Sequence, residues 1–236
     1  MFPTLQLGPL SLQTPGLILL LALWLGLEAM EGQARRSSQN AETLYNLVFT
    51  ALTVGLLGAR LSFAAQNFAI FAQTPLSLIS PNPGLLDPFG GLALGGLAAL
   101  VYGRRKNLAL WPTLDALTPL FAVMAAGLAL SAAAAGTFFG MESGLPWSVE
   151  LWGAKRHPTQ FYALGLALLN LTILTWRTRK NPPQAGGLFR LFVALTAFGW
   201  LLVEGLRGDS ILLPGGWRLG QILAWVVLAG AGWEKR

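Results

Sequence analysis

Apolar residues along this chain gather into long runs separated by short polar connections. Seven such segments lie near residues 15–30, 43–66, 84–103, 112–136, 159–176, 187–206 and 218–234. A helix that crosses a bilayer needs roughly 20 mostly apolar residues. We therefore expect an all-α integral membrane protein with seven transmembrane helices, built as a single polytopic membrane domain over residues 1–236. The uncharged connection 67–83 is expected to lie along the interface as a short amphipathic or re-entrant piece.

Composition agrees with a membrane protein and removes several kinds of chemistry. The chain is 54% hydrophobic and 11% charged, whereas a soluble domain carries about 25% charged residues. It has no cysteine and one histidine, so disulfides, thiolate catalysis and histidine-rich metal sites are excluded. The net charge of +6 is not arranged as a continuous stripe, and no nucleic-acid partner is expected. We also expect no metal and no cofactor.

Lys and Arg are distributed unevenly between the connections, and this predicts the orientation. Eleven lie on one side of the predicted membrane, namely Arg35, Arg36, Arg104, Arg105, Lys106, Arg177, Arg179, Lys180, Arg190, Lys235 and Arg236. Four lie on the other side, namely Lys155, Arg156, Arg207 and Arg218. Because cytoplasmic loops carry the excess of Lys and Arg, we expect the N-terminus outside and the C-terminus in the cytoplasm. The start of the chain has no positive n-region, so no cleavable signal peptide is expected.

Charged side chains inside the predicted spans are the first functional candidates, because each costs at least ~2.5 kcal/mol near mid-bilayer. Arg60 lies within the second span, where snorkelling to the outer headgroups is the structural alternative. Glu204 and Arg207 share a helical face at i and i+3, and a local ion pair ending the helix is the alternative for them. Arg60 is also a possible partner of Glu204. Several arginines and an acid near the outer leaflet suit an anionic phosphodiester headgroup, because the guanidinium fork matches phosphate oxygens.

The single histidine stands in the stretch "KRHPTQFY", residues 155–162, at the predicted start of the fifth span. Pro158 is suited to the first turn of a helix, where its missing N–H costs nothing. His157 would then be the cap of that helix, and this interpretation competes with a catalytic imidazole.

Several stretches together resemble one family. "RHPTQFY" (156–162), "GLLGARLSF" (55–63) and "LGQILA" (219–224) resemble signatures of the bacterial prolipoprotein diacylglyceryl transferases. "LQLGPLSLQTPGLILL" (5–20), "FGGLALGGLAAL" (89–100) and "GLFRLFVALTAFGWLLVEGLRGD" (187–209) resemble further segments of that family, in the same order.

The resemblance implies a function, a location and a set of residues. The family transfers the diacylglyceryl group of phosphatidylglycerol to the lipobox cysteine thiol of a prelipoprotein in the bacterial cytoplasmic membrane, with a site that faces the outer leaflet. The catalytic residues it implies are Arg60, Glu204, Arg207 and His157. The substrate-binding residues it implies are Arg60, Arg207, Arg156, Gln160, Tyr162 and Gln221.

The chain also departs from the family pattern at several polar positions. The family's long arginine-asparagine signature falls on "LALSAAAAGT" (128–137), which gives Ala129, Ala132, Ala135 and Thr137 in place of polar residues. Its helix-three histidine falls on Phe89, and a tyrosine of its first helix falls on Pro15. Two hypotheses follow: a transferase with a reduced site, or a catalytically inactive or repurposed homologue that binds an anionic phospholipid in the outer leaflet. A small transporter is a weaker idea, because the sequence shows no internal repeat.

Overall fold

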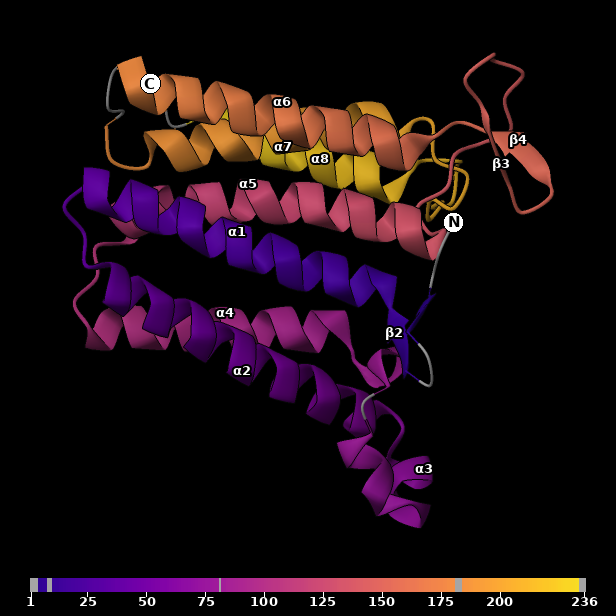
Figure 1. The fold of residues 1–236 in the computed structure, drawn as a ribbon, viewed down its shortest axis with the longest axis horizontal. Coiled ribbons are helices and arrows are strands. Elements are labelled where there is room, and N and C mark those ends of the chain that lie inside the picture. Colours follow the sequence, from indigo (N-terminus) through magenta and orange to yellow (C-terminus); the bar gives the residue numbers. More distant parts are fainter. Residues whose placement is uncertain (1–3, 8–9, 81, 181–183, 234–236) are drawn as a thin grey trace. The chain divides into compact units, whose positions relative to one another are not determined.

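The computed structural model describes residues 4–7, 10–80, 82–180 and 184–233 (Figure 1). Within these residues the chain forms eight α-helices, two short 3-10 helices and two small β-hairpins. The helices divide into two compact units. One contains residues 1–37 and 114–236, and the other contains residues 38–113.

The larger unit holds the helices α1, α5, α6, α7 and α8. Their bounds are Thr14–Arg36, Leu110–Ala135, Thr159–Lys180, Gly187–Glu204 and Leu219–Trp233. Helix α7 packs against both α6 and α8. Helices α1 and α5 approach closely through small residues, because a Cβ added at Gly127 would lie 2.3 Å from the Cβ of Ala22. Small residues at helix contacts are the usual means of packing inside a bilayer.

The smaller unit is a close pair of helices joined by a short irregular connection. Helix α2 covers Ala41–Gln66 and α4 covers Pro88–Arg105. Between them lie α3 (Phe68–Gln73), η1 (Pro75–Ile79) and η2 (Pro83–Leu85). The two long helices touch backbone to backbone, since a Cβ added at Gly95 would lie 2.9 Å from the carbonyl oxygen of Ala51.

Side-chain caps explain where several helices begin. Asn40 accepts from the amide of Thr43 at the start of α2, and Asp87 accepts from the amides of Phe89 and Gly90 at the start of α4. Asp115, inside α5, accepts from the amides of Gly186 and Phe189 at 2.6 and 2.8 Å. This carboxylate therefore satisfies two of the amides that are left free at the beginning of α7.

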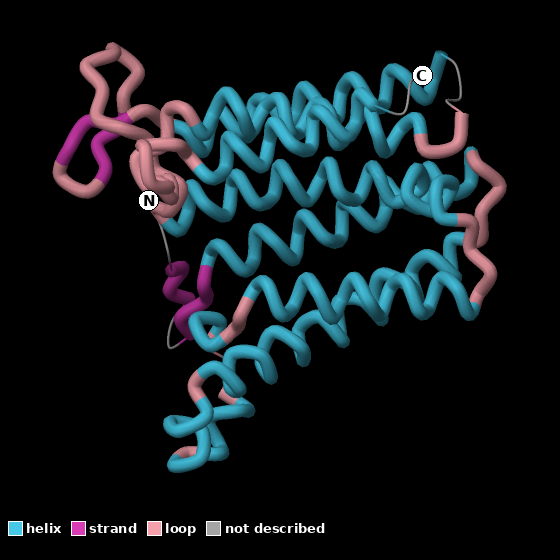
Figure 2. The backbone as a smooth tube through the Cα atoms, turned by 180° about the vertical axis from the view of Figure 1, so that it is seen from behind, coloured by secondary structure: helices cyan, strands magenta, loops and turns pink. Residues whose placement is uncertain are grey.

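Two hairpins interrupt the expected all-helical fold. Strand β1 (Thr4–Leu7) pairs with β2 (Leu10–Gln13), and β3 (Val149–Leu151) pairs with β4 (Ala154–Arg156). The second hairpin turns through Trp152 and Gly153, whose φ angles of 55° and 76° suit a tight two-residue turn. It lies between α5 and α6, and Figure 2 shows it projecting beyond the ends of these helices. Apolar runs predict helices, whereas these strands have only three or four residues each and form no such run.

The seven apolar segments overlap the seven long helices. Among the described residues, five helices are long and apolar enough to cross a membrane: α1, α2, α5, α6 and α7. Helix α4 has 18 residues and ends in two arginines, and the apolar part of α8 is shorter, at Leu219–Ala231. The protein is thus an α-helical membrane protein. Seven crossings and the single membrane domain stay predictions.

The connection 67–83 forms local structure, and its place along the interface stays a prediction. It contains α3 and η1, and several of its apolar side chains are exposed, among them Phe68, Ile70, Leu76 and Ile79.

Candidate functional site

The C-terminal end of α7 carries a buried ion pair. Nη1 of Arg207 donates to Oε2 of Glu204 at 2.9 Å, and Nε of Arg207 donates to Oδ1 of Asp209 at 2.9 Å. Glu204 is 2% exposed and Arg207 is 9% exposed. The predicted i, i+3 pair is therefore present, and Asp209 is a second carboxylate on the same guanidinium.

The guanidinium of Arg207 lies over two aromatic rings. Its central carbon lies 4.4 Å from the ring centroid of Phe138 and 5.5 Å from that of Trp200. Such stacking is favourable for a cation over an aromatic face. In the part of the chain that the structure describes, Nη2 of Arg207 donates no hydrogen bond. Arg207 is thus fixed by two acids and two rings while part of its fork stays open.

A second arginine, Arg218, closes the end of α7. Its Nη1 donates to the carbonyl oxygens of Glu204 and Arg207 at 3.0 and 2.6 Å, and to Oγ of Ser210 at 2.7 Å. The last carbonyls of a helix have no partner inside the helix, and a cation can satisfy them. Two acids and two arginines therefore meet here, and their formal charges cancel.

The strip Thr137–Met141, which follows α5, lies against this end of α7. The amide of Met141 donates to the carbonyl of Leu206, and the amide of Gly208 donates to the carbonyl of Phe139, both at 2.8 Å. Gly208 permits the close approach, because a Cβ there would lie 2.9 Å from the carbonyl oxygen of Gly140. We call residues 137–141 the central strip.

Residues of the "RHPTQFY" stretch hold the central strip from α6. Oγ1 of Thr159 donates to the carbonyl of Phe138 at 2.6 Å, and Nε2 of Gln160 donates to the carbonyl of Thr137 at 2.8 Å. Thr159 and Gln160 are 1% and 3% exposed. The stretch is therefore a clamp on the chain between α5 and α6.

His157 does not use its side chain as the predicted cap. Its Nδ1 is buried and has no hydrogen-bond partner among the described residues. The ring instead stands edge-on to Tyr162, with 6.3 Å between centroids. The backbone amide of His157 donates to Met141 at 3.0 Å, so the residue contributes to the clamp through its main chain. The hydroxyl of Tyr162 accepts from Nε1 of Trp147 at 2.8 Å.

Arg156 and Gln221 lie in the same unit and contact backbone carbonyls. Nε of Arg156 donates to the carbonyl of Leu151 at 3.1 Å, its Nη2 lies 3.5 Å from Oε1 of Glu142, and its guanidinium lies 5.1 Å from the ring centroid of Phe139. Arg156 thus braces the β3–β4 hairpin. Nε2 of Gln221, on α8, donates to the carbonyl of Leu201 at 3.5 Å.

Arg60 belongs to the smaller unit, and all of its guanidinium nitrogens donate hydrogen bonds. A guanidinium has five N–H donors, and all five point at carbonyl oxygens of the connection between α2 and α4. The acceptors are Ser77, Leu78 (2.9 Å), Ser80 (3.0 Å), Asn82 (3.4 Å) and Leu85 (3.1 Å). Arg60 is 9% exposed. These contacts do not favour the alternative that Arg60 snorkels to headgroups. A pairing of Arg60 with Glu204, which belongs to the other unit, stays a prediction.

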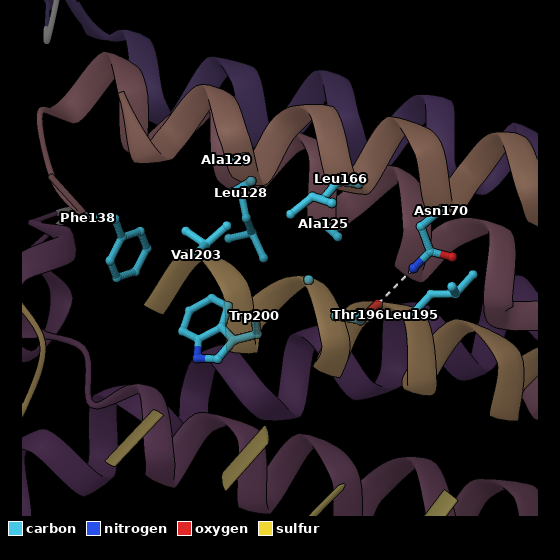
Figure 3. A pocket seen from close by; sticks show the side chains of 13 residues that line it. Ala125, Leu128, Ala129, Phe138, Leu166, Asn170, Leu195, Thr196, Trp200 and Val203 are labelled. Atoms are coloured by element: carbon cyan, nitrogen blue, oxygen red, sulfur yellow. Dashed lines mark hydrogen bonds between the residues drawn. The ribbon is translucent and has the colours of Figure 1, made fainter. Parts of the chain in front are cut away.

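A pocket of about 220 Å³ lies between α5, α6 and α7 (Figure 3). Phe138 and Trp200, which hold Arg207, also line it. Ala129 lines it too. The rest of its wall is apolar except for Asn170 and Thr196.

Sequence reasoning missed several residues of this site. Asp209 and Arg218 carry charge, yet their contacts depend on how the chain turns after α7. Phe138 and Trp200 give no signal at all, because an aromatic residue in an apolar sequence is indistinguishable from ordinary membrane-facing surface. The described residues contain no cluster of three or more His, Cys, Asp or Glu side chains that could hold a metal ion.

Comparison with known proteins connects this geometry to a family. The sequence model of a family described as prolipoprotein diacylglyceryl transferase matches residues 3–233. A relative from Cutibacterium acnes is 30% identical, and the match covers 96% of this chain and 81% of the relative. Relatives from Synechococcus elongatus and Thermus thermophilus are 28% and 27% identical, with 96% and 89% of this chain and 84% and 85% of each relative covered. All three are named phosphatidylglycerol–prolipoprotein diacylglyceryl transferase. This chain belongs to the prolipoprotein diacylglyceryl transferase family.

Proposed function

We propose that this protein transfers the diacylglyceryl group of phosphatidylglycerol to the lipobox cysteine thiol of a prelipoprotein. The match to the family over nearly the whole chain supports the reaction type. The observation that carries the proposal is the buried Glu204–Arg207 pair, whose guanidinium keeps Nη2 open beside an apolar pocket. The guanidinium could bind an anionic headgroup, and the apolar pocket beside it could hold an acyl chain of the same lipid.

The chemistry asks for stabilisation of a leaving phosphate. The thiol sulfur forms a bond to the terminal glyceryl carbon, the bond from that carbon to the phosphate oxygen breaks, and glycerol phosphate leaves. The thiol proton is taken up by an acceptor in the site and then passes to solvent. Arg207 would bind the phosphate through its open donors, because fixed donors aimed at developing charge are the largest common source of catalysis. Glu204 and Asp209 would hold the guanidinium in place.

The other residues have supporting roles in this proposal. Gln160 acts by clamping the central strip, and Arg60 acts by shaping the connection that it holds. Arg156, Tyr162 and Gln221 are proposed to line the approach of the substrates. His157 is the single imidazole of the chain, and its unpartnered Nδ1 makes it the proposed proton acceptor for the thiol.

We further propose seven membrane crossings in a bacterial cytoplasmic membrane, with the site facing the outer leaflet. The uneven Lys and Arg distribution supports this orientation. Because the chain has no cysteine, single cysteines test it cleanly. Gly144→Cys, in the connection after α5, is expected to react with a membrane-impermeant maleimide in intact cells. Gln184→Cys, before α7, is expected to react only after lysis, and the reverse pattern would overturn the orientation.

A second candidate is a lipid-binding homologue without transferase activity. The formal charge of Arg207 is balanced by two carboxylates at 2.9 Å, and the pocket wall carries Ala129 where the family pattern has an arginine. Both features reduce the positive potential available to a leaving phosphate.

One experiment separates the two candidates. The protein is produced in cells depleted of their own transferase, and a prelipoprotein is examined by mass spectrometry for an added diacylglyceryl group. The transferase predicts the modified product with the wild type and its loss with Arg207→Gln. The binder predicts unmodified prelipoprotein together with phosphatidylglycerol that copurifies with the wild type. Neither product nor copurified phosphatidylglycerol would refute both candidates.

A further inference from the structure

The pocket between α5, α6 and α7 exists because small residues face one another across three helices. Ala125 and Ala129 face it from α5, and Ala163 and Ala167 face it from α6. Gly199 faces it from α7. A Cβ added at Gly199 would lie 3.5 Å from Leu166, an ordinary contact distance. The glycine is therefore not required for close backbone packing, in contrast to Gly95 between α2 and α4.

The pocket has two different ends. Phe138, Trp200 and Val203 line the end next to Arg207. At the other end, Nδ2 of Asn170 donates to Oγ1 of Thr196 at 2.9 Å and to the carbonyl of Phe192 at 3.3 Å. The lining positions on α7 extend from Leu195 to Val203, which corresponds to about 12 Å of helix.

The polar end is fixed in orientation. Asn170 is 5% exposed, and only its amide nitrogen can donate to the Phe192 carbonyl, so the nitrogen and oxygen positions are assigned by this bond. Oδ1 of Asn170 has no partner among the described residues. A polar pair inside a helix bundle is a poor surface for a hydrocarbon chain. It therefore marks the depth to which an apolar ligand can extend.

We propose that this pocket holds one acyl chain of the anionic phospholipid whose phosphate binds Arg207, and that the Asn170–Thr196 pair limits how far the chain enters. The proposal rests on the proposed function and deepens it, because it names the part of the substrate that this face recognises. Phe138 and Trp200 connect the two parts: each contacts the guanidinium and each lines the pocket. A single amphiphile can thus place its anionic head at Arg207 and its chain along the alanines.

The test uses phosphatidylglycerol that carries a photoactivatable diazirine midway along one chain. The full-length protein is reconstituted in vesicles containing this probe, irradiated, digested and analysed by mass spectrometry. Phosphatidylcholine with the same chain serves as the headgroup control. Adducts are expected on the pocket-lining parts of α5, α6 and α7 with phosphatidylglycerol, and at a much lower yield with phosphatidylcholine.

Matched leucine variants test whether the acyl chain of the lipid lies in the pocket. Gly199→Leu places a side chain in the pocket and is expected to lower the pocket adducts by roughly ten-fold, because a filled space opposes the chain sterically. Gly165→Leu, on α6, is the control, since a Cβ there meets nothing within 4 Å, and its adducts are expected to match the wild type. Ala129→Leu is a second filling variant with the same expected loss, should Gly199→Leu fold poorly.

The outcomes separate this inference from the proposed function. Equal pocket labelling by both lipids, or pocket labelling that Gly199→Leu and Ala129→Leu leave unchanged, would overturn the acyl-chain assignment. If transfer of the diacylglyceryl group occurs while the pocket stays unlabelled, the inference fails and the proposed function stands. If phosphatidylglycerol labels the pocket and no transfer occurs, the lipid site stands and the transferase activity does not.

Discussion

Arg60 and Arg207 are two buried arginines, each 9% exposed, and they are used in opposite ways. Arg60 directs all five donors at backbone carbonyls of one connection. Arg207 is held by carboxylates and aromatic rings and keeps Nη2 open. The sequence marks both as candidates, Arg60 as a cation inside an apolar segment and Arg207 as a cation just beyond one, three residues after Glu204. The difference teaches that the partners of a buried charge, and not its burial, distinguish a structural arginine from a ligand-binding one.

Arg207→Gln should give the largest effect. Loss of a donor aimed at the leaving phosphate is expected to reduce diacylglyceryl transfer by roughly 100-fold or more, measured with a purified prelipoprotein. It also leaves Glu204 as a buried unpaired carboxylate, which costs about 3–5 kcal/mol. The double variant with Glu204→Gln should recover thermal stability without recovering activity. Full activity in either variant would remove Arg207 from the site.

Arg60→Gln should mainly affect stability. The substitution leaves several carbonyls of the connection 77–85 without donors, and we expect a loss of about 3 kcal/mol or more, because hydrogen bonds from a charged group each contribute roughly 1.5–3 kcal/mol. Limited proteolysis should then cut this connection faster. Arg60→Lys should restore little, since an ammonium has three donors. A fully stable Arg60→Gln protein that has lost phosphatidylglycerol binding would reverse the comparison between the two arginines.

Phe138→Leu should have a moderate effect on the arginine that it holds. The leucine keeps an apolar wall but removes the ring beneath the guanidinium, an interaction worth about 1–2 kcal/mol when desolvated. We expect a several-fold rise in KM for phosphatidylglycerol and a smaller change in kcat. Phe138→Tyr should behave as the wild type. An equal loss in both variants would indicate packing rather than stacking.

Thr159→Val should produce the smallest change. It removes one hydrogen bond, from Oγ1 to the carbonyl of Phe138, and leaves the shape of the side chain. We expect about 1 kcal/mol of destabilisation, measured as a lowered Tm. Thr159→Ser retains the hydroxyl and should be closer to the wild type. A variant as damaging as Arg207→Gln would give the clamp a direct part in the reaction.

The fold was accessible from sequence to a greater extent than the site was. Hydrophobic runs located every long helix, because a bilayer imposes length and apolarity on each crossing. The i, i+3 spacing located the Glu204–Arg207 pair for the same local reason. The five carbonyl partners of Arg60 and the rings beside Arg207 come from distant or irregular segments, which no local pattern encodes. The β3–β4 hairpin was missed because its strands have three residues each.

The central strip is held almost entirely by its own main chain. Carbonyls of Thr137, Phe138 and Phe139 accept hydrogen bonds, and the amide and carbonyl of Met141 are also engaged. The exposed side chain of Thr137 can therefore change without moving the backbone that carries it, whereas Phe138 and Phe139 also stack against Arg207 and Arg156. Thr137 and Ala129 are therefore positions where new polar groups could be grafted onto an intact scaffold.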